Sequence, residues 1–280
     1  NTEVLDVFKD QEGVFNVVTN KEILFSEKVI ITTGGLSYRA TGSTGAGLIF
    51  AEKLGHTIIT VKPALVGIET SNVKMKNWQG ISLKNVACSI LQDGKKVSSY
   101  FGEMLFTHYG LSGPIILDLS AIVYDIIMNN KKIEASIDLK PALTIDKLNA
   151  RMLREFKTFH NKQLLNILKE LLPGKMSILF LEHVKIDPKK PVNQVTRSER
   201  EQIVRTLKDL RFTIKRTRPI EEAIITRGGI STKEIDPKTM ESKICKGLYF
   251  AGEVIDIDAK TGGYNLQAAF STGFVAGMNI

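Results

Sequence analysis

The stretch that most constrains the fold is an apolar run that leads into glycines and then into a helical pattern. Residues 29–33, "VIITT", have the continuous apolar character of a strand buried in a parallel sheet. In the following "LIFAEKLG", Leu48, Ala51 and Leu54 recur at helical spacing, and Gly55 is suited to end the helix. We therefore expect a strand–turn–helix unit, the building block of an α/β fold.

The glycines of this turn have the wrong order for a dinucleotide-binding loop. Gly42, Gly45 and Gly47 spell G-x-x-G-x-G, whereas the phosphate-binding fingerprint is G-x-G-x-x-G directly at the strand end. The acidic residue that should follow about 20 residues later, at a second strand end, is also missing. We interpret these glycines as residues required by the backbone geometry of the turn.

The pattern along the chain changes four times. "VLDVF" and "VFNVVT" near the N-terminus indicate a hairpin, and His56 to Lys140 reads as short strands of an antiparallel sheet or barrel. Thr144 to Leu210 is helical: "KQLLNILKELLPG" reads as a helix ended by Pro-Gly, and Thr196 with Glu199 forms a capping box. "RFTIKR" returns to strand, and "GLYFAGEV" is a buried strand before a helix that begins at "TGGYNLQ".

This order predicts an α/β protein with a discontinuous, partial Rossmann-like domain that carries an inserted β domain, which in turn carries a helical insert. The Rossmann-like domain comprises residues 1–56 and 228–280. An antiparallel β-barrel-like domain on the substrate side comprises residues 57–143 and 211–227, and a small helical domain comprises residues 144–210.

The C-terminal motif has the composition of half a nucleotide site. Glu253 follows a buried strand, where a carboxylate can accept hydrogen bonds from sugar or ribityl hydroxyls. Gly262 and Gly263 then open a helix, whose unpaired N–H groups suit a pyrophosphate or an electron-rich carbonyl edge. A glycine-eased crossover without a ligand is the alternative interpretation.

Four segments, in order, resemble one known family. They are "VIITTGGLSYRATGSTGAG", "LFTHYGLSGPIIL", "ITRGGISTKEIDPKTMESK" and "GLYFAGEVIDIDAKTGGYNLQAAFSTGFVAG". They resemble the BaiN/aminoacetone-oxidase-like family of bacterial NAD(P)/FAD-dependent flavoproteins. The resemblance implies FAD as cofactor, NAD(P)H as a transient electron donor, and an ADP-binding segment before Asn1. This chain is then expected to hold the flavin-proximal half of the site.

The resemblance also implies cofactor-binding residues. Thr33, Gly34 and Gly35 match the family's A/T-G-G turn, and Gly252 and Glu253 match the ribityl-binding end of the last strand. The turn and helix start beside the flavin ring are matched by four residues: Gly262, Gly263, Asn265 and Leu266.

The catalytic residues are not defined by the sequence. Because a flavin carries the electrons, no catalytic triad or metal cluster is required, and the sequence contains neither. His108, in a polar and glycine-containing loop, is a candidate acid–base group, and Tyr109 and Tyr38 are weaker candidates. A structural hydrogen-bonding role is the alternative for each.

Charge and cysteine content bound the partners. The net charge is +8, of which about +11 lies between Lys140 and Arg218, indicating a solvated helical face or an anionic partner. No nucleic-acid motif is present, so we expect a small-molecule substrate rather than nucleic acid. No apolar run approaches a membrane span, and the distant Cys88 and Cys245 suggest free thiols in the cytoplasm.

These observations predict an FAD-dependent oxidoreductase that acts on a small molecule, with oxidase and reductase modes both open. The alternative is a flavin-free fragment or binding module whose basic helical insert contacts an anionic partner.

Overall fold

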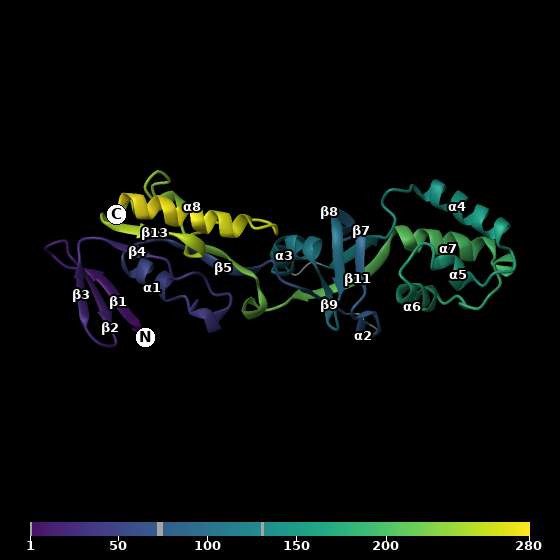
Figure 1. The fold of residues 1–280 in the computed structure, drawn as a ribbon, viewed down its shortest axis with the longest axis horizontal. Helices are drawn as coiled ribbons and strands as arrows, with labels where there is room; N and C mark the ends of the chain where they lie inside the picture. The colour runs from purple at the N-terminus through teal and green to yellow at the C-terminus, as the bar shows by residue number, and fades with distance from the viewer. Residues whose placement is uncertain (1, 72–74, 130–131) are drawn as a thin grey trace. The chain divides into compact units, whose positions relative to one another are not determined.

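The computed structural model describes residues 2–71, 75–129 and 132–280. The chain forms two compact units: Asn1–Val66 together with Arg218–Ile280, here called unit 1, and Gly67–Thr217, here called unit 2. Figure 1 shows their elements. The three-domain division expected above, with boundaries at residues 56 and 227 and a separate helical domain, stays a prediction.

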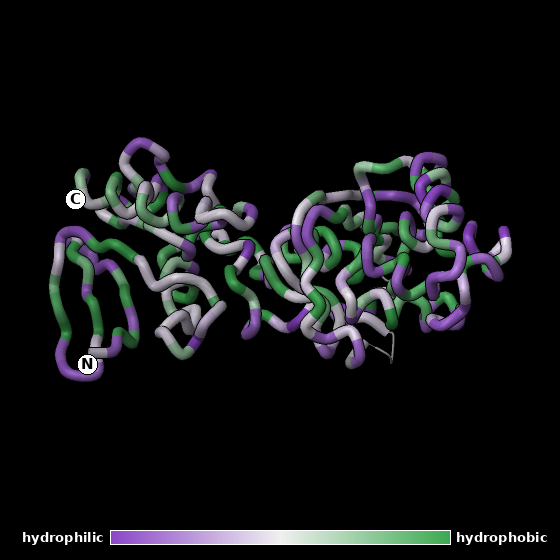
Figure 2. Tube along the Cα trace, turned by 45° about the vertical axis from the view of Figure 1, so that its right-hand side comes forward, coloured by the Kyte–Doolittle hydropathy of each residue, from purple (hydrophilic) through white to green (hydrophobic). Residues whose placement is uncertain are grey.

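Unit 1 begins with a three-stranded antiparallel sheet of β1 (Val4–Lys9), β2 (Phe15–Thr19) and β3 (Ile23–Ser26). The hairpin predicted from "VLDVF" and "VFNVVT" is therefore confirmed. In Figure 2 the strands of this sheet are largely hydrophobic, and hydrophilic turns separate them. Phe15 is fully buried in the core of unit 1.

The predicted strand–turn–helix unit is present in unit 1. β4 (Val29–Ile31) pairs in parallel with β13 (Leu248–Phe250), as expected for a strand of an α/β sheet. The glycine turn then leads into α1 (Ala46–Lys53), and α8 (Tyr264–Asn279) follows β13. Gly55, with φ of 92°, follows the end of α1, where a left-handed residue is common.

The glycines of the turn serve backbone geometry. Gly45, at φ of 87°, is the N-cap of α1, and Gly42 at φ of 105° ends a short 3₁₀ turn. Gly47 lies against β4, so a Cβ there would clash with the side chains of Thr33 and Ile31. The interpretation of these residues as a turn, rather than a phosphate loop, agrees with these conformations.

Unit 1 is completed by an antiparallel pair of strands and by short helical turns. β5 (Ile58–Ala64) pairs with β12 (Ile225–Ile230). Short 3₁₀ helices of unit 1 lie at Arg39–Thr41, Ile220–Glu222, Thr232–Glu234 and Gly252–Val254, and another lies in unit 2 at Val192–Gln194.

Unit 2 contains a closed antiparallel barrel, which confirms the predicted barrel within an α/β protein. The strand order is β10-β11-β6-β9-β8-β7, and β7 closes the barrel on β10. The strands, with the short helix α2, have these bounds: β6 (Ile68–Thr70), α2 (Met75–Trp78), β7 (Ser82–Gln92), β8 (Lys95–Phe106), β9 (Gly110–Ser112), β10 (Ile133–Asp138) and β11 (Leu210–Thr217).

Two helices of unit 2, the short α2 and the longer α3, were not expected. The region from His56 to Lys140 was interpreted as short strands, but α3 (Pro114–Ile127) lies within it. Pro114 occupies the first turn, where its missing N–H costs nothing, and Ile116, Leu119 and Val123 are fully buried on one face. The apolar spacing of these residues is helical, and it was obscured by the β-branched residues around them.

The remaining helices of unit 2 are α4 (Ile145–Thr158), α5 (Leu164–Leu168), α6 (Gly174–Val184) and α7 (Arg197–Lys208). The capping box of Thr196 and Glu199 is confirmed at the start of α7. The Pro-Gly stop was wrong: α5 ends earlier, and Pro173 is the N-cap of α6, because proline is tolerated at a helix start. The helices and the barrel share one hydrophobic core.

Two absences hold for the residues that the structure describes. None of their helices combines the length and the apolar character that a membrane crossing requires. The same residues contain no group of three or more histidine, cysteine, aspartate or glutamate side chains placed to hold a metal ion.

His56 is a buried histidine in the core of unit 1. Its Nε2 lies 2.8 Å from Oγ of Ser242, and that Oγ accepts hydrogen bonds from the backbone N–H groups of Ile244 and Cys245. Nδ1 lies 3.3 Å from Oε2 of Glu234. Burial lowers the pKa of His56, and the Glu234 carboxylate opposes this effect. The folded protein therefore favours neutral His56.

This pKa direction predicts a pH dependence of stability. The unfolded chain binds a proton on His56 more readily than the folded chain, so the contribution to stability is complete above pH 6.5 and falls as the pH decreases below it. Urea unfolding at about pH 7.5 and about pH 5.5 should show this loss in the wild type and a smaller loss in His56→Gln. His160→Gln, at an exposed position, is the control. An unchanged pH dependence in His56→Gln would contradict the prediction.

Candidate functional site

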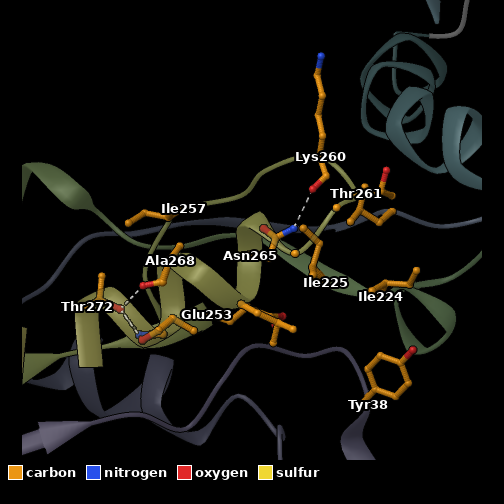
Figure 3. A pocket seen from close by; sticks show the side chains of 16 residues that line it. Tyr38, Ile224, Ile225, Glu253, Ile257, Lys260, Thr261, Asn265, Ala268 and Thr272 are labelled. Atoms are coloured by element: carbon orange, nitrogen blue, oxygen red, sulfur yellow. Dashed lines mark hydrogen bonds between the residues drawn. The ribbon is translucent and has the colours of Figure 1, made fainter. Parts of the chain in front are cut away.

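The candidate site is a pocket of about 500 Å³ within unit 1. Figure 3 shows side chains that line it, from the start of α8, the end of β13 and the segments around Tyr38 and Ile224. The lining is mostly apolar, with a few polar groups, as is usual for small-molecule sites. The lining residues are Tyr38, Leu65, Ile224, Ile225, Gly252, Glu253, Ile257, Lys260, Thr261, Gly262, Gly263, Asn265, Leu266, Ala268, Ala269 and Thr272.

Glu253 joins separate segments of unit 1 at this pocket. It follows β13, and its Oε1 accepts a hydrogen bond of 2.9 Å from Oγ of Ser37 and one of 2.7 Å from the backbone N–H of Thr226. Hydrogen bonds to a charged acceptor contribute more than neutral ones. No hydrogen bond to its second oxygen, Oε2, is found among the described residues.

Thr226 holds the turn that follows β4. Its Oγ1 accepts hydrogen bonds from the backbone N–H groups of Leu36, at 2.7 Å, and Ser37, at 3.0 Å. Gly35 lies so close that a Cβ there would clash with Oγ1 of Thr226 and lie 2.8 Å from Oε1 of Glu253. Position 35 therefore requires glycine for lack of space. Its φ angle lies in the range that other residues also adopt.

The start of α8 is shaped by two glycines and one asparagine. Gly262, at φ of 118°, and Gly263, at φ of 89°, adopt conformations that favour glycine. The side chain of Asn265 accepts a hydrogen bond from the backbone N–H of Ala259 at 2.8 Å and donates one to its carbonyl at 2.9 Å. Among the described residues no side chain caps α8, so the first backbone N–H groups of this helix, which belongs to the pocket lining, have no side-chain cap.

Thr272 fixes Gly252 against α8, and Figure 3 shows Thr272 beside Ala268, to which it is hydrogen-bonded. Its Oγ1 accepts a 3.0 Å hydrogen bond from the backbone N–H of Gly252 and donates one of 2.8 Å to the carbonyl of Ala268. Gly252, which directly precedes Glu253, is thereby held to α8.

The structure brings together most of the residues that the sequence pointed to. Gly252, Glu253, Gly262, Gly263, Asn265, Leu266 and Tyr38 all line the pocket. Thr33, Gly34 and Gly35 do not line it; they form the turn before Ser37. His108 and Tyr109 belong to unit 2, where their rings meet edge to face at 5.0 Å, and His108 is exposed.

Three functional positions were not predicted: Ser37, Thr226 and Thr272. Ser37 and Thr226 stand inside the quoted motifs "TGGLS" and "ITRGG", but no spacing rule marks them as partners across 189 residues. Thr272 looked like an ordinary helix residue, and only its place above Gly252 gives it a role.

Comparison with known proteins places the chain in a family. The family described as "HI0933-like protein barrel and H2TH domain" matches residues 62–225, more than half of the chain. The chain belongs to the HI0933-like family. This is the family of BaiN-like flavoproteins that the sequence motifs resemble, so the predicted family is confirmed.

The chain is similar to three curated members of the HI0933-like family. It is 30% identical to the 3-dehydro-bile acid delta(4,6)-reductase of Clostridium scindens, over 90% of this chain and 61% of that protein. It is 30% identical to the ribosomal RNA dihydrouridine synthase of Escherichia coli and 31% identical to that of Haemophilus influenzae, each over 100% of this chain and 66% of the relative. The chain thus spans less than two thirds of the length of these relatives.

Replacing Thr226 with valine tests the hydrogen bonds that hold the turn. The change keeps the shape but leaves two backbone N–H groups without their acceptor, so we expect a loss of about 1–3 kcal/mol in the free energy of unfolding. Chemical denaturation measures this loss. Thr60→Val, at an exposed position of β5, is the matched control and should stay within about 0.5 kcal/mol of the wild type. Equal effects of the two changes would contradict the assigned role.

Proposed function

We propose that the protein is an FAD-dependent oxidoreductase that works as a reductase, and that this chain holds the flavin-proximal half of its site. The observation that carries the proposal is the pocket of unit 1, where Glu253, the Gly262–Gly263 turn and the uncapped start of α8 converge. Membership of a flavoprotein family supports the same conclusion.

The pocket residues fit a flavin in their chemistry. No neighbouring atom lies within 4 Å of where a Cβ of Gly263 would be, so a planar ring can approach the backbone there. The backbone N–H groups at the start of α8 suit an electron-rich carbonyl edge. The second oxygen of Glu253 can accept a hydrogen bond from a hydroxyl, while its first oxygen holds Ser37 and Thr226.

When bound, a reduced flavin supplies a hydride equivalent. The chain's own residues would bind, orient and shield the reacting groups. Asn265 holds the loop at Ala259 and thereby fixes the turn that would hold the flavin. Tyr38, which the sequence offered as a weaker candidate than His108, lines the pocket and is a candidate to donate a proton to the substrate from its hydroxyl. His108 belongs to unit 2 and does not line this pocket.

The names of the relatives favour reduction over oxidation. One relative is named as a reductase of a bile acid, and two are named for making a dihydro form of uridine. Both names describe the reduction of an unsaturated compound. We infer the same reaction here: a ring carbon–carbon double bond gains a hydride and a proton, and a reduced nicotinamide is the electron source.

Anaerobic mixing tests the reductase mode. NADH or NADPH should bleach the yellow absorbance of the full-length protein within seconds to minutes, and a small unsaturated substrate or an RNA should restore it. Bleaching by an amine substrate, followed by recovery only with oxygen, would instead support an oxidase.

The two free thiols, Cys88 and Cys245, agree with the cytoplasm as the proposed location.

The alternative of a flavin-free fragment has its own test. Titration of the 280-residue chain with FAD should show weak binding if the adenylate half of the site lies elsewhere. Tight stoichiometric binding would contradict the proposal that this chain holds only half of the site.

Replacing Glu253 with glutamine tests the cofactor site. The change removes the charge that strengthens hydrogen bonds from hydroxyls, so FAD retention by the full-length protein should weaken by roughly 1.5–3 kcal/mol, about 10- to 150-fold. Dialysis with absorbance at the flavin band measures the effect. Glu52→Gln, at an exposed position of α1, is the control and should keep its flavin. A colourless wild-type protein that cannot be reconstituted with FAD would overturn the proposed function.

A further inference from the structure

Unit 2 contains a cationic hollow, separate from the pocket of unit 1, at the junction of β7, β10 and α4. It has a volume of about 400 Å³, and a second hollow of about 340 Å³ adjoins it and shares Lys84, Leu139 and Lys140. The charged residues lining the first hollow are Lys84, Lys140 and Arg151, together with the polar Asn85. No acidic side chain lines either hollow.

A β-bulge directs residues of β7 to this hollow. The register of β7 against β8 shifts between Leu83 and Val86, and Asn85 adopts a left-handed conformation at φ of 54°. Bulges insert an extra residue, bend the strand and change the direction of its side chains. As a result Lys84 and Asn85, although consecutive, are both exposed and both line the hollow.

The turn on the other side of the hollow is held rigidly by a third lysine. Nζ of Lys208 donates to the carbonyls of Lys140, at 2.9 Å, and Leu143, at 2.6 Å, and lies 2.6 Å from Oδ2 of Asp138. Asp138, the acid that precedes the turn, is thus paired with Lys208. Lys208 fixes the backbone of the turn, and its charge is compensated.

Lys140 and Arg151 are left without such compensation. Each is partly buried, and neither has an ion pair with any acidic residue in the part of the chain that the structure describes. Burial and the positive charge of Arg151 both lower the pKa of Lys140. Two partly buried like charges disfavour each other, so an anion in the hollow would stabilise both.

The positive charge of the hollow continues over the rest of unit 2. Unit 2 contains 25 lysines and arginines against 15 aspartates and glutamates. Within the described part of the chain, the ion pair of Lys84 is a long, exposed contact of 3.8 Å between its Nζ and Oε1 of Glu103. A positive field over a whole unit attracts a polyanion more than a single small anion, because each neutralised phosphate releases counterions.

We propose that the hollow formed by Lys84, Lys140 and Arg151 is a phosphate-binding site that takes a backbone phosphate of an RNA strand. Arg151 supplies a planar donor group suited to two phosphate oxygens, and Lys140 supplies a point charge. Contacts of this kind position a strand without reading its sequence. The choice of RNA rests on the proposed function, since two relatives are named for acting on ribosomal RNA. It differs from our expectation of a small-molecule substrate.

Binding of a short fluorescein-labelled RNA hairpin to the full-length protein tests the site. Fluorescence anisotropy over a range of salt concentrations should show that the double variant Lys140→Ala, Arg151→Ala binds about tenfold more weakly. The slope of log K against log salt concentration should be shallower for the double variant than for the wild type, by about 1–2. Arg154→Ala, on an exposed position of the same helix, removes the same charge outside the hollow and should change affinity less than about twofold.

Further measurements separate the outcomes. Arg151→Met removes a repelling charge, so its melting temperature should equal or exceed that of the wild type while RNA affinity falls. A lowered melting temperature together with unchanged RNA affinity would show a structural role and overturn the proposal. Binding of inorganic phosphate or uridine monophosphate by a protein that does not bind the RNA, with that binding lost in the double variant, would assign the hollow to a phosphorylated small molecule and overturn the choice of RNA.

The RNA-binding measurement is independent of flavin chemistry, because fluorescence anisotropy needs no electron donor. A yellow protein that NADPH bleaches but that does not bind RNA would refute the phosphate site and leave the proposed function standing. A colourless protein that still loses RNA affinity in the double variant, and not in Arg154→Ala, would support the phosphate site and refute the flavin function.

Discussion

The pocket of unit 1 depends on one carboxylate oxygen. Oε1 of Glu253 accepts hydrogen bonds from Ser37, which follows β4, and from Thr226, which lies in β12. These bonds join three parts of the chain at one point, and Thr226 adds two more bonds to the same turn. Gly35 permits this arrangement because it leaves room for both side chains. A residue expected only to bind a cofactor therefore also builds the site.

Elements with strong local signals could be predicted from the sequence. The parallel strand at residues 29–33, the turn glycines and the capping box of α7 each depend on residues close together in the chain. The barrel could be predicted as a class, since short strands and turns alternate. α3 could not, because most apolar residues of its buried face are β-branched isoleucines and a valine, which also suit strands. The error at Pro173 has a similar cause, since proline marks a boundary but does not say which helix it belongs to.

The candidate site was predicted in its linear motifs and missed in its long-range contacts. Glu253 and the glycines before α8 stand in one short segment, so their chemistry can be inferred from spacing alone. The hydroxyl of Thr226 acts on residues 189 and 190 positions earlier, a distance at which single-sequence patterns carry no information. The cationic hollow is similar: Lys84 and Arg151 line it from β7 and α4, two elements that are distant in the sequence.

The discontinuity of unit 1 has a consequence for the order of folding. Its two segments are separated by the whole of unit 2, so β4 and β13 cannot pair until residues 67–217 have been synthesised. Unit 2 has a continuous chain and many contacts between neighbouring elements, which favours early folding during synthesis. The bond from Ser37 to Glu253 closes a loop of 216 residues, but if unit 2 is already compact the chain to be closed is effectively much shorter. The inserted barrel then acts as an internal folding aid for the pocket, which is completed last.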